Sequence, residues 1–533
     1  MRRSATPKTF GCFRVLPKVE KGTEEFFHGQ VARGVVSCHG PEHCMRRDMT
    51  GSLRSVAFLL VAVATRMAAA AYPNVLLIIT DEHNFRTLGC YRDLLSQDQG
   101  EMWGPGTIVR TPNLDRLAEQ GVLCSRAYAT APVCSPCRAA MITGLYPHNA
   151  GVPTNNFPLR DDVPTLATLL NAQGYRTGFM GKWHLGGKGK PEWSPKIDGG
   201  FGFTTFMFNR GHWKKFLLTN AGPEVAARDA KGQPSYAVAD ATAETYATDF
   251  LTDRTIDFVT ADSEQPFFAV VSYPDPHGPN TVRTPYDKMF GHLRFLPPRT
   301  YGRVNVPSPK WLGGEKNHAI FRGEQMAAYF GMVKCLDENI GRLLVALEET
   351  GKLDSTIIMM TSDHGDLCYE HDRLNKGNPY EGSARVPMLI RYPARLPKGS
   401  VYREPVGTVD VTPTLVGIAD VKTDVVFQGR DLSRSLAEGV DAESKITFLR
   451  NSGTAANWIC AVDARYKLVL SVDDRPWLFD AEQDPDELLN FFGRPGSEQP
   501  ARRLAEALQR YIVGMSDAFG KHPAIAASLE TCL

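Results

Sequence analysis

The run NVLLIIT at residues 74–80 decides the fold that we expect for this chain. It is nearly continuous in apolar and β-branched residues, as in a parallel strand that is buried on both faces. Two later runs share this design: FFAVVS at residues 267–272 and TIIMMT at residues 356–361. Strands that alternate with helices predict an α/β fold, with a mostly parallel central sheet flanked by helices. The helical patterns between the strands lie at residues 112–120, 164–172 and 323–350.

The pattern of secondary-structure signals in the sequence changes after about residue 400. Residues 401–428 are rich in loop signals and hold one short helical stretch. Residues 466–472 and 477–479 have the pattern of a hairpin, and residues 502–515 that of a closing helix. We therefore predict a main domain at residues 72–400 and a smaller C-terminal α+β subdomain at residues 401–533.

Acidic residues and histidines follow the expected strands directly. Asp81 and Glu82 come after the first strand, and Asp363 and His364 come after the run at 356–361. The active sites of such sheets lie beyond the carboxyl ends of the strands. Carboxylate oxygens favour Ca²⁺ or Mg²⁺, and one histidine does not make a zinc site. Any one of these pairs alone fits an ordinary solvated loop, but two pairs placed in this way predict a site for a hard cation.

The stretch Cys134-Ser135-Pro136-Cys137-Arg138 carries the second signal. Pro136 suits the first turn of a helix, which would place Cys134 just before a helix N-terminus. Arg138 adds a permanent cation with a forked set of donors. The alternatives are a structural cysteine buried under a helix, a redox pair, and half of a zinc site. A second Cys-x-x-Cys pair, which a structural zinc site would need, does not occur in the sequence.

Basic side chains that could hold an anion are spread along the chain: Lys182, His184, His277 and Lys376. Singly, a lysine is commonly a solvated surface charge, and a histidine a hydrogen-bonded structural residue. Together with Arg138 they could clamp a tetrahedral oxyanion beside a metal ion.

The charge of the chain is uneven. Its 533 residues have a formal net charge of +1, which does not favour nucleic acid as the main partner. The first 71 residues carry a net charge of +6, so the rest carries −5. The basic surplus therefore belongs entirely to the N-terminal segment.

That segment has the pattern of a secretory leader. Arg46, Arg47 and Arg54 precede an apolar run at residues 56–64, and small residues follow at 68–71. The run is too short for a membrane span, and the layout is that of a signal peptide at residues 45–71. We expect translation to start at Met45 or Met49, with residues 1–44 belonging to an over-extended gene model. The alternative is a genuine cytosolic extension.

Export predicts a secreted, periplasmic, lumenal or lysosomal protein, in which disulfides are permitted. The 11 cysteines are dispersed, and their spacing assigns no pairing.

Many short motifs occur in a fixed order from about residue 72 to residue 495 and make the chain resemble the type I sulfatases. These are the formylglycine-dependent members of the alkaline-phosphatase-like superfamily. The motifs are Leu76-Leu-Ile-Ile-Thr-Asp81, Thr111-Pro-Asn-Leu-Asp115, Cys134-Ser-Pro-Cys-Arg138 with Thr143-Gly144, Gly181-Lys-Trp-His-Leu-Gly186, Pro276-His277, Thr361-Ser-Asp-His-Gly365, Lys376 with Tyr380-Glu381, Arg385-Val-Pro387, and Leu478-Phe-Asp480.

The resemblance implies that a formylglycine-generating enzyme oxidises Cys134 to an aldehyde. One hydroxyl of its hydrate would attack the sulfur of a sulfate ester and expel the alcohol, and the other would then release sulfate by elimination. Arg138 would orient the diol, and His184 would help to regenerate the aldehyde. Lys182, His277 and Lys376 would hold the sulfate, with His277 or Lys376 as the acid. The implied ligands of Ca²⁺, or of Mg²⁺ or another divalent cation, are Asp81, Glu82, Cys134, Asp363 and His364.

Three residues depart from the family pattern. Glu82 stands where a second Asp is common, so its longer side chain can coordinate differently or not at all. Cys137 stands where Ser is most frequent and adds a thiol that could compete for oxidation. His364 replaces an Asn that many members have.

The sequence therefore predicts a sulfatase that acts on a sulfated small molecule or carbohydrate. Two alternatives are a formylglycine-dependent phosphonate monoester or phosphodiester hydrolase, and an inactive relative that only binds. Specificity should lie in the loops at residues 209–213 and 279–303 and in the C-terminal subdomain, where Trp213, Arg283 and Tyr286 could grip a sugar. The oligomeric state is left open.

Overall fold

The computed structural model describes residues 72–303, 307–312, 318–439 and 445–533. The leader expected at residues 1–71 lies outside the described residues. By their internal contacts, residues 71–533 form one unit. Among the residues that the structure describes, none of the helices combines the length and the apolar character that a membrane crossing requires.

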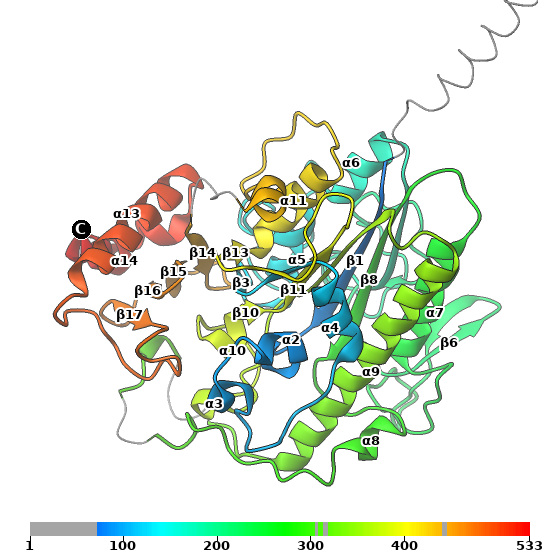
Figure 1. The fold of residues 1–533 in the computed structure, drawn as a ribbon, viewed down its shortest axis with the longest axis horizontal. Helices are drawn as coiled ribbons and strands as arrows, with labels where there is room; N and C mark the ends of the chain where they lie inside the picture. The colour runs from blue at the N-terminus through cyan, green and yellow to red at the C-terminus, as the bar shows by residue number, and fades with distance from the viewer. Residues whose placement is uncertain (1–71, 304–306, 313–317, 440–444) are drawn as a thin grey trace, which may run out of the picture. The chain divides into compact units, whose positions relative to one another are not determined.

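The centre of the fold is an eight-stranded sheet in the order β12-β2-β11-β9-β1-β8-β4-β5 (Figure 1). The neighbours of β1, which are β8 and β9, run parallel to it, and β4 and β5 continue the parallel arrangement. Only β11 runs antiparallel to both its partners. The predicted α/β class and mostly parallel sheet are confirmed. The bounds are β1 Asn74–Asp81, β2 Val122–Cys124, β4 Arg176–Lys182, β5 Met207–Phe208, β8 Phe267–Pro276, β9 Thr356–Ser362, β11 Met388–Arg391 and β12 Ser400–Tyr402.

Apolar side chains on both faces of β1 explain why it lies in the middle of the sheet. Leu76 and Ile78 pack in one core with helices α4, α7 and α9. Val75, Leu77 and Ile79 pack in the other core, with α5, α6 and α11. Figure 1 shows these helices covering the sheet. They span α4 Pro112–Glu119, α5 Cys134–Thr143, α6 Leu166–Ala172, α7 Ala247–Thr260, α9 Gly323–Glu349 and α11 Val411–Ile418.

Short elements complete the main part of the fold. A three-stranded sheet has the order β10-β3-β13, and β6 and β7 form a separate hairpin. The strands are β3 Ala127–Tyr128, β6 Phe216–Thr219, β7 Gly222–Val225, β10 Arg385–Val386 and β13 Val406–Gly407. The short helices are α2 Gly89–Arg92, α3 Gln97–Gly100, α8 Tyr286–Met289, α10 Glu381–Ala384 and α12 Ser433–Glu438.

The C-terminal part is a four-stranded antiparallel sheet under two helices. The expected hairpin is present as β16 and β17. The helix expected at residues 502–515 is present as α13, but it does not close the chain: α13 ends at Gly514, Ser516 takes a positive φ of 53°, and α14 follows from Pro523. The bounds are β14 Thr447–Arg450, β15 Trp458–Val462, β16 Tyr466–Ser471, β17 Trp477–Asp480, α13 Glu498–Gly514 and α14 Pro523–Cys532.

The chain just beyond residue 400 still belongs to the main sheets. Strand β12 pairs with β2, and β13 pairs with β3. The antiparallel C-terminal sheet begins only at β14. The domain boundary at residues 400 and 401 stays a prediction.

Candidate active site

The ends of three strands in the parallel part of the sheet, β9, β1 and β4, bring expected polar residues to one edge. Asp81 and Lys182 are the last residues of β1 and β4, and Asp363 directly follows β9. All three side chains are fully buried. Because the strands are parallel neighbours, residues far apart in the chain reach the same edge.

Cys134 approaches this edge from α5. The helix begins at Cys134, so the cysteine is its first residue and does not precede it as expected. Val133 is the extended residue before the helix, with φ −150° and ψ 145°, and Pro136 lies in the first turn. The helix stops at Gly144, whose φ of 69° favours glycine. The start of α5 therefore directs the Cys134 side chain at the strand ends.

Asp81, Cys134, Asp363 and His364 form a buried group whose four ligand atoms all lie within 4.8 Å of one another. Cys134 Sγ is 3.2 Å from His364 Nε2 and 3.9 Å from Asp81 Oδ1. His364 Nδ1 donates to the carbonyl of Gly365 at 3.0 Å, which leaves Nε2 free to bind a cation. Two carboxylates and an imidazole nitrogen suit a divalent cation, so the residues fit the metal that the resemblance implies.

Glu82 lies apart from this group. Its φ is 65°, and its carboxylate points at two anion-binding side chains: Oε1 is 3.0 Å from Lys376 Nζ and Oε2 is 3.0 Å from His277 Nε2. Burial raises the pKa of Glu82 to about 8, although Lys376 acts against this. The structure brings Glu82 to the anion-binding side chains and not to the other expected metal ligands.

Arg138 ties three strand ends together. Its Nε donates to Asp363 Oδ2 at 2.8 Å, and its Nη1 donates to Lys182 O and Ser272 Oγ, both at 2.6 Å. Its Nη2 is 3.6 Å from Asp81 Oδ2. The side chain is 3% exposed. Arg138 therefore sets the positions of two of the carboxylates that could hold a metal.

The expected anion-binding cations converge on the same place. Lys182 Nζ forms an ion pair with Asp81 Oδ2. Lys376 Nζ donates to His277 Nε2 at 2.6 Å, while His277 Nδ1 donates to the carbonyl of Gly278 at 2.8 Å. Burial and the neighbouring Lys376 hold the pKa of His277 well below its usual value. His277 is thus a neutral imidazole beside two ammonium groups.

His184 is also buried, and within the described part of the chain its side chain forms no hydrogen bond or ion pair with these groups. Its Nδ1 has no hydrogen-bond partner among the described residues, and its φ is 61°. Burial, Lys182 and Arg138 hold the pKa of His184 well below its usual value.

His212 is a site residue that the motifs did not reveal. Its Nε2 accepts from Lys182 Nζ at 2.9 Å, and its ring stacks on that of His277 with centroids 3.4 Å apart. Asp81, Cys134, His212 and His277 form a second group that could hold a metal. The sequence pointed only to its loop, residues 209–213, as a specificity region. No local spacing marks a histidine that reaches the site from a loop.

Cys137 is not a partner of Cys134. Its Sγ is 3.1 Å from Thr408 Oγ1, while Cys134 Sγ lies against His364. Burial raises the pKa of the Cys137 thiol. None of the eight cysteines that the structure describes forms a disulfide.

This mostly parallel sheet, with its polar site at the carboxyl edge, is the alkaline-phosphatase-like fold. A model of the family Sulfatase matches residues 73–421, and one described as N-sulphoglucosamine sulphohydrolase, C-terminal, matches residues 369–513. The chain belongs to the sulfatase family and is a sulfuric ester hydrolase.

Several relatives are similar to this chain over most of its length. An ulvan-active sulfatase of Formosa agariphila is 28% identical and covers 84% of this chain and 82% of its own length. An N-acetylglucosamine-6-O-sulfatase of Bacteroides thetaiotaomicron is 26% identical and covers 82% and 86%. A solved phosphonate monoester hydrolase from Silicibacter pomeroyi is 25% identical with a TM-score of 0.65, over 84% of this chain and 96% of that one.

Proposed function

We propose that this protein hydrolyses sulfate esters of carbohydrates, with residue 134 as the nucleophile after its oxidation to formylglycine. The observation that carries the proposal is the position of Cys134 between two sets of side chains. On one side lie the buried donors Asp81, Asp363 and His364. On the other lie the cations that can bind a sulfate group.

A divalent cation, Ca²⁺ by family likeness, would be held by Asp81, Asp363, His364 and residue 134. When bound, it would supply positive charge to activate a hydroxyl and to neutralise a sulfate oxygen. Arg138 keeps Asp363 in place through the 2.8 Å bond from its Nε. Glu82 lies outside this group, so we assign it to positioning Lys376 and His277.

Formylglycine at position 134 would supply a hydrated aldehyde, whose hydroxyl attacks sulfur and whose collapse releases sulfate. Cys134 is 2% exposed in the folded chain. A buried side chain is inaccessible to a modifying enzyme, so we place the oxidation before folding, by a formylglycine-generating enzyme. This timing fits a protein that is exported, and we propose the secretory pathway or the periplasm as its location.

Lys182, His277 and Lys376 bind the sulfate oxygens in this proposal. Burial lowers the pKa of Lys376, but Glu82, Cys134 and Asp81 together raise it above its usual value, so the ammonium group stays charged. Lys376 Nζ donates to His277 Nε2, which makes this pair the source of the proton for the leaving alcohol. His184, with its free and buried Nδ1, is the candidate base for the return of the aldehyde. His212 joins the group by orienting Lys182.

The substrate class rests on relatives. The named relatives include an ulvan-active sulfatase and an N-acetylglucosamine-6-O-sulfatase, and both cover more than four fifths of this chain. The alternative activity, phosphonate monoester or phosphodiester hydrolysis, is supported by the phosphonate monoester hydrolase of similar fold.

Two measurements on protein from its native host test the proposal. Mass spectrometry of the peptide that contains Cys134 should find formylglycine, and para-nitrophenyl sulfate should be turned over faster than bis-nitrophenyl phosphate. Cys134→Ala should abolish turnover, and Cys137→Ser is the matched control that should keep both modification and activity. An unmodified thiol with full activity, or a dominant phosphodiesterase rate, would overturn the proposal.

A further inference from the structure

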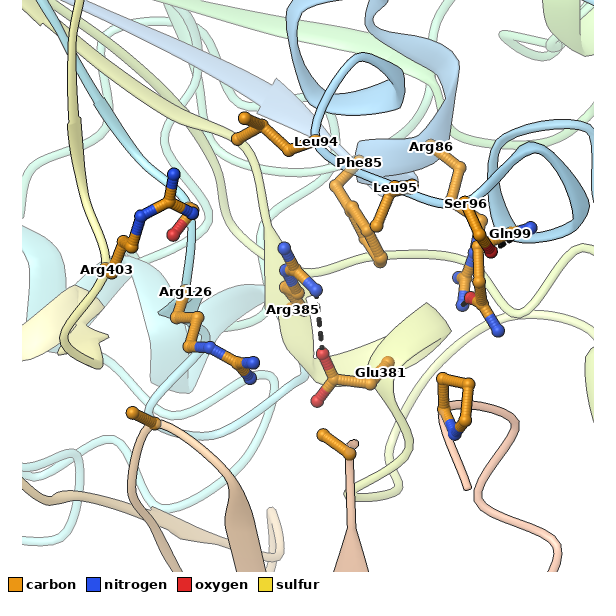
Figure 2. Close-up of a pocket in the computed structure, with 14 residues that line it drawn as sticks. Phe85, Arg86, Leu94, Leu95, Ser96, Gln99, Arg126, Glu381, Arg385 and Arg403 are labelled. Carbon is orange, nitrogen blue, oxygen red and sulfur yellow. Dashed lines mark hydrogen bonds and ion pairs between the residues drawn. The ribbon is translucent and has the colours of Figure 1, made fainter. Parts of the chain in front are cut away.

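A cavity of about 450 Å³ lies where the main sheet region meets the C-terminal sheet (Figure 2). Phe85 and Arg86, after β1, form one wall, and Arg126, Arg385 and Arg403 come from other segments. Ala464, Ala481 and Pro485 of the C-terminal part close it. None of the candidate catalytic residues lines this cavity.

Three guanidinium groups face the cavity with little opposing charge. Figure 2 shows Arg126, Arg385 and Arg403 around one space. Within the described residues, Arg126 and Arg403 form no ion pair with a carboxylate, whereas Arg385 Nη1 donates to Glu381 Oε2 at 3.2 Å. Arg385 Nε is buried and has no hydrogen-bond partner in the described part of the chain. The guanidinium groups of Arg126 and Arg403, which line the cavity without an ion pair among the described residues, therefore remain available to a ligand.

Glu381 is the one acidic residue in the lining, and its charge is already compensated. Its Oε1 accepts from Lys467 Nζ at 2.7 Å, and Lys467 also donates to Glu487 Oε1 at 2.7 Å. Lys467 and Arg385 thus balance Glu381 and Glu487. Arg86 is balanced by Glu370 at 2.9 Å. Arg126 and Arg403 remain as two guanidinium groups without a direct ion pair among the described residues, although, against the effect of burial, Tyr128 and Glu381 near Arg126 raise its pKa.

Apart from Ser96, Gln99 and Ser125, the rest of the lining is apolar. The Arg385 guanidinium lies over the Phe85 ring, 4.2 Å from its centroid, and Leu94 and Leu95 lie beside it. The volume is within the usual range of small-ligand sites, about 300–1,000 Å³. An inorganic ion alone would leave most of this space empty.

We propose that this cavity is a binding site for a sulfate- or phosphate-type oxyanion carried on a sugar-sized molecule, separate from the active site. Guanidinium forks match the geometry of tetrahedral oxyanions and bind them in pairs of hydrogen bonds. Arg126 and Arg403 supply the charge, Arg385 adds a third guanidinium group to the lining, and Phe85 and Leu95 offer an apolar surface to a sugar ring. Bound anion would also relieve the repulsion between the three arginines.

The experiment uses full-length protein carrying Cys134→Ala, so that no sulfate ester is consumed. Titration calorimetry with inorganic sulfate and with a glucosamine sulfate ester should detect binding that Arg126→Ala and Arg403→Ala each weaken by about tenfold or more. The double substitution should remove that binding, and it should remove the thermal stabilisation that sulfate confers through it. Arg434→Ala, on the exposed face of α12, is the matched control and should change neither.

Comparing the affinities of the glucosamine sulfate ester and of inorganic sulfate shows whether the cavity binds a sugar-linked anion or a free one. Tighter binding of the sugar ester than of inorganic sulfate supports the apolar wall as part of the site, and equal binding identifies a free anion as the ligand. Sulfate binding that is unchanged in Arg126→Ala/Arg403→Ala, and lost only in His277→Ala/Lys376→Ala, would overturn the inference. Arg403→Ala in otherwise native protein should leave turnover of para-nitrophenyl sulfate unchanged. A loss of anion binding to the cavity can therefore be told apart from a loss of the proposed sulfatase activity.

Discussion

Replacing Arg138 by lysine tests whether the guanidinium fork builds the active site. The native side chain donates to Asp363, to the carbonyl of Lys182 and to Ser272, all within 2.8 Å. A lysine at this position reaches at most one of these acceptors and keeps only the charge. Two buried acceptors lose their donors, at a cost of about 1–3 kcal/mol each, so the free energy of unfolding should fall by roughly 2–6 kcal/mol.

The same substitution should impair catalysis by releasing Asp363. Loss of a partner that orients a metal ligand typically costs about 10–100-fold in metal affinity or activity. We expect a fall of that size in kcat/KM for para-nitrophenyl sulfate, partly restored by added calcium because the ligand is misplaced and not removed. Urea unfolding measures the stability in parallel.

Arg434→Lys is the control for this experiment, because Arg434 is 76% exposed and, among the residues that the structure describes, pairs only with Glu438 on the surface of α12. Exposed pairs contribute at most about 1 kcal/mol, so this variant should resemble the native protein. If Arg138→Lys kept kcat/KM and stayed within about 0.5 kcal/mol of native stability, as neutral surface substitutions do, the positioning role of Arg138 would be refuted.

Three further predictions concern the buried charges and the metal. Lys467→Met leaves Glu381 and Glu487 without their shared cation and should lower the free energy of unfolding by about 3–5 kcal/mol, measured by urea unfolding. Burial, opposed by Lys467 and aided by Glu381, raises the pKa of Glu487 to about 7, against 4.5 when unfolded. The folded protein then binds more protons between these values, so stability should fall as the pH rises from about 4.5 to about 7 and stay level above that. Glu487→Gln should flatten this fall, and an unchanged profile would contradict the assignment. Chelation with EDTA should abolish sulfatase activity, and Ca²⁺ should restore it in native protein but not in Asp363→Ala; full activity in the chelated enzyme would exclude the metal site.

The sequence predicted the elements whose signals are local. The strands at residues 74–80, 267–272 and 356–361 appear as β1, β8 and β9, because an unbroken apolar run can be satisfied only by burial on both faces. The polar residues after them were found at one edge because parallel neighbours share their direction. The helix start at Cys134 was predicted to within one residue from Pro136.

The features that the sequence did not predict depend on contacts between distant segments of the chain. His212 enters the site from a loop, and its position depends on how that loop packs on His277. The second helix of the C-terminal part was missed because a turn at Ser516 separates it from α13. The arginine cavity is assembled from segments of the main part and the C-terminal part, so no single stretch contains its pattern.

The sequence by itself determined the sheet, the family and the candidate catalytic residues, since strand periodicity and short motifs are properties of neighbouring residues. Only the tertiary structure decided what each side chain meets. Glu82 follows Asp81 directly, yet its positive φ turns its carboxylate to Lys376 and His277, while Asp81 faces Cys134 and His364. The positive φ of Glu82 and the side chains that it meets set that division, and those side chains lie about 200 and about 300 positions further along the chain.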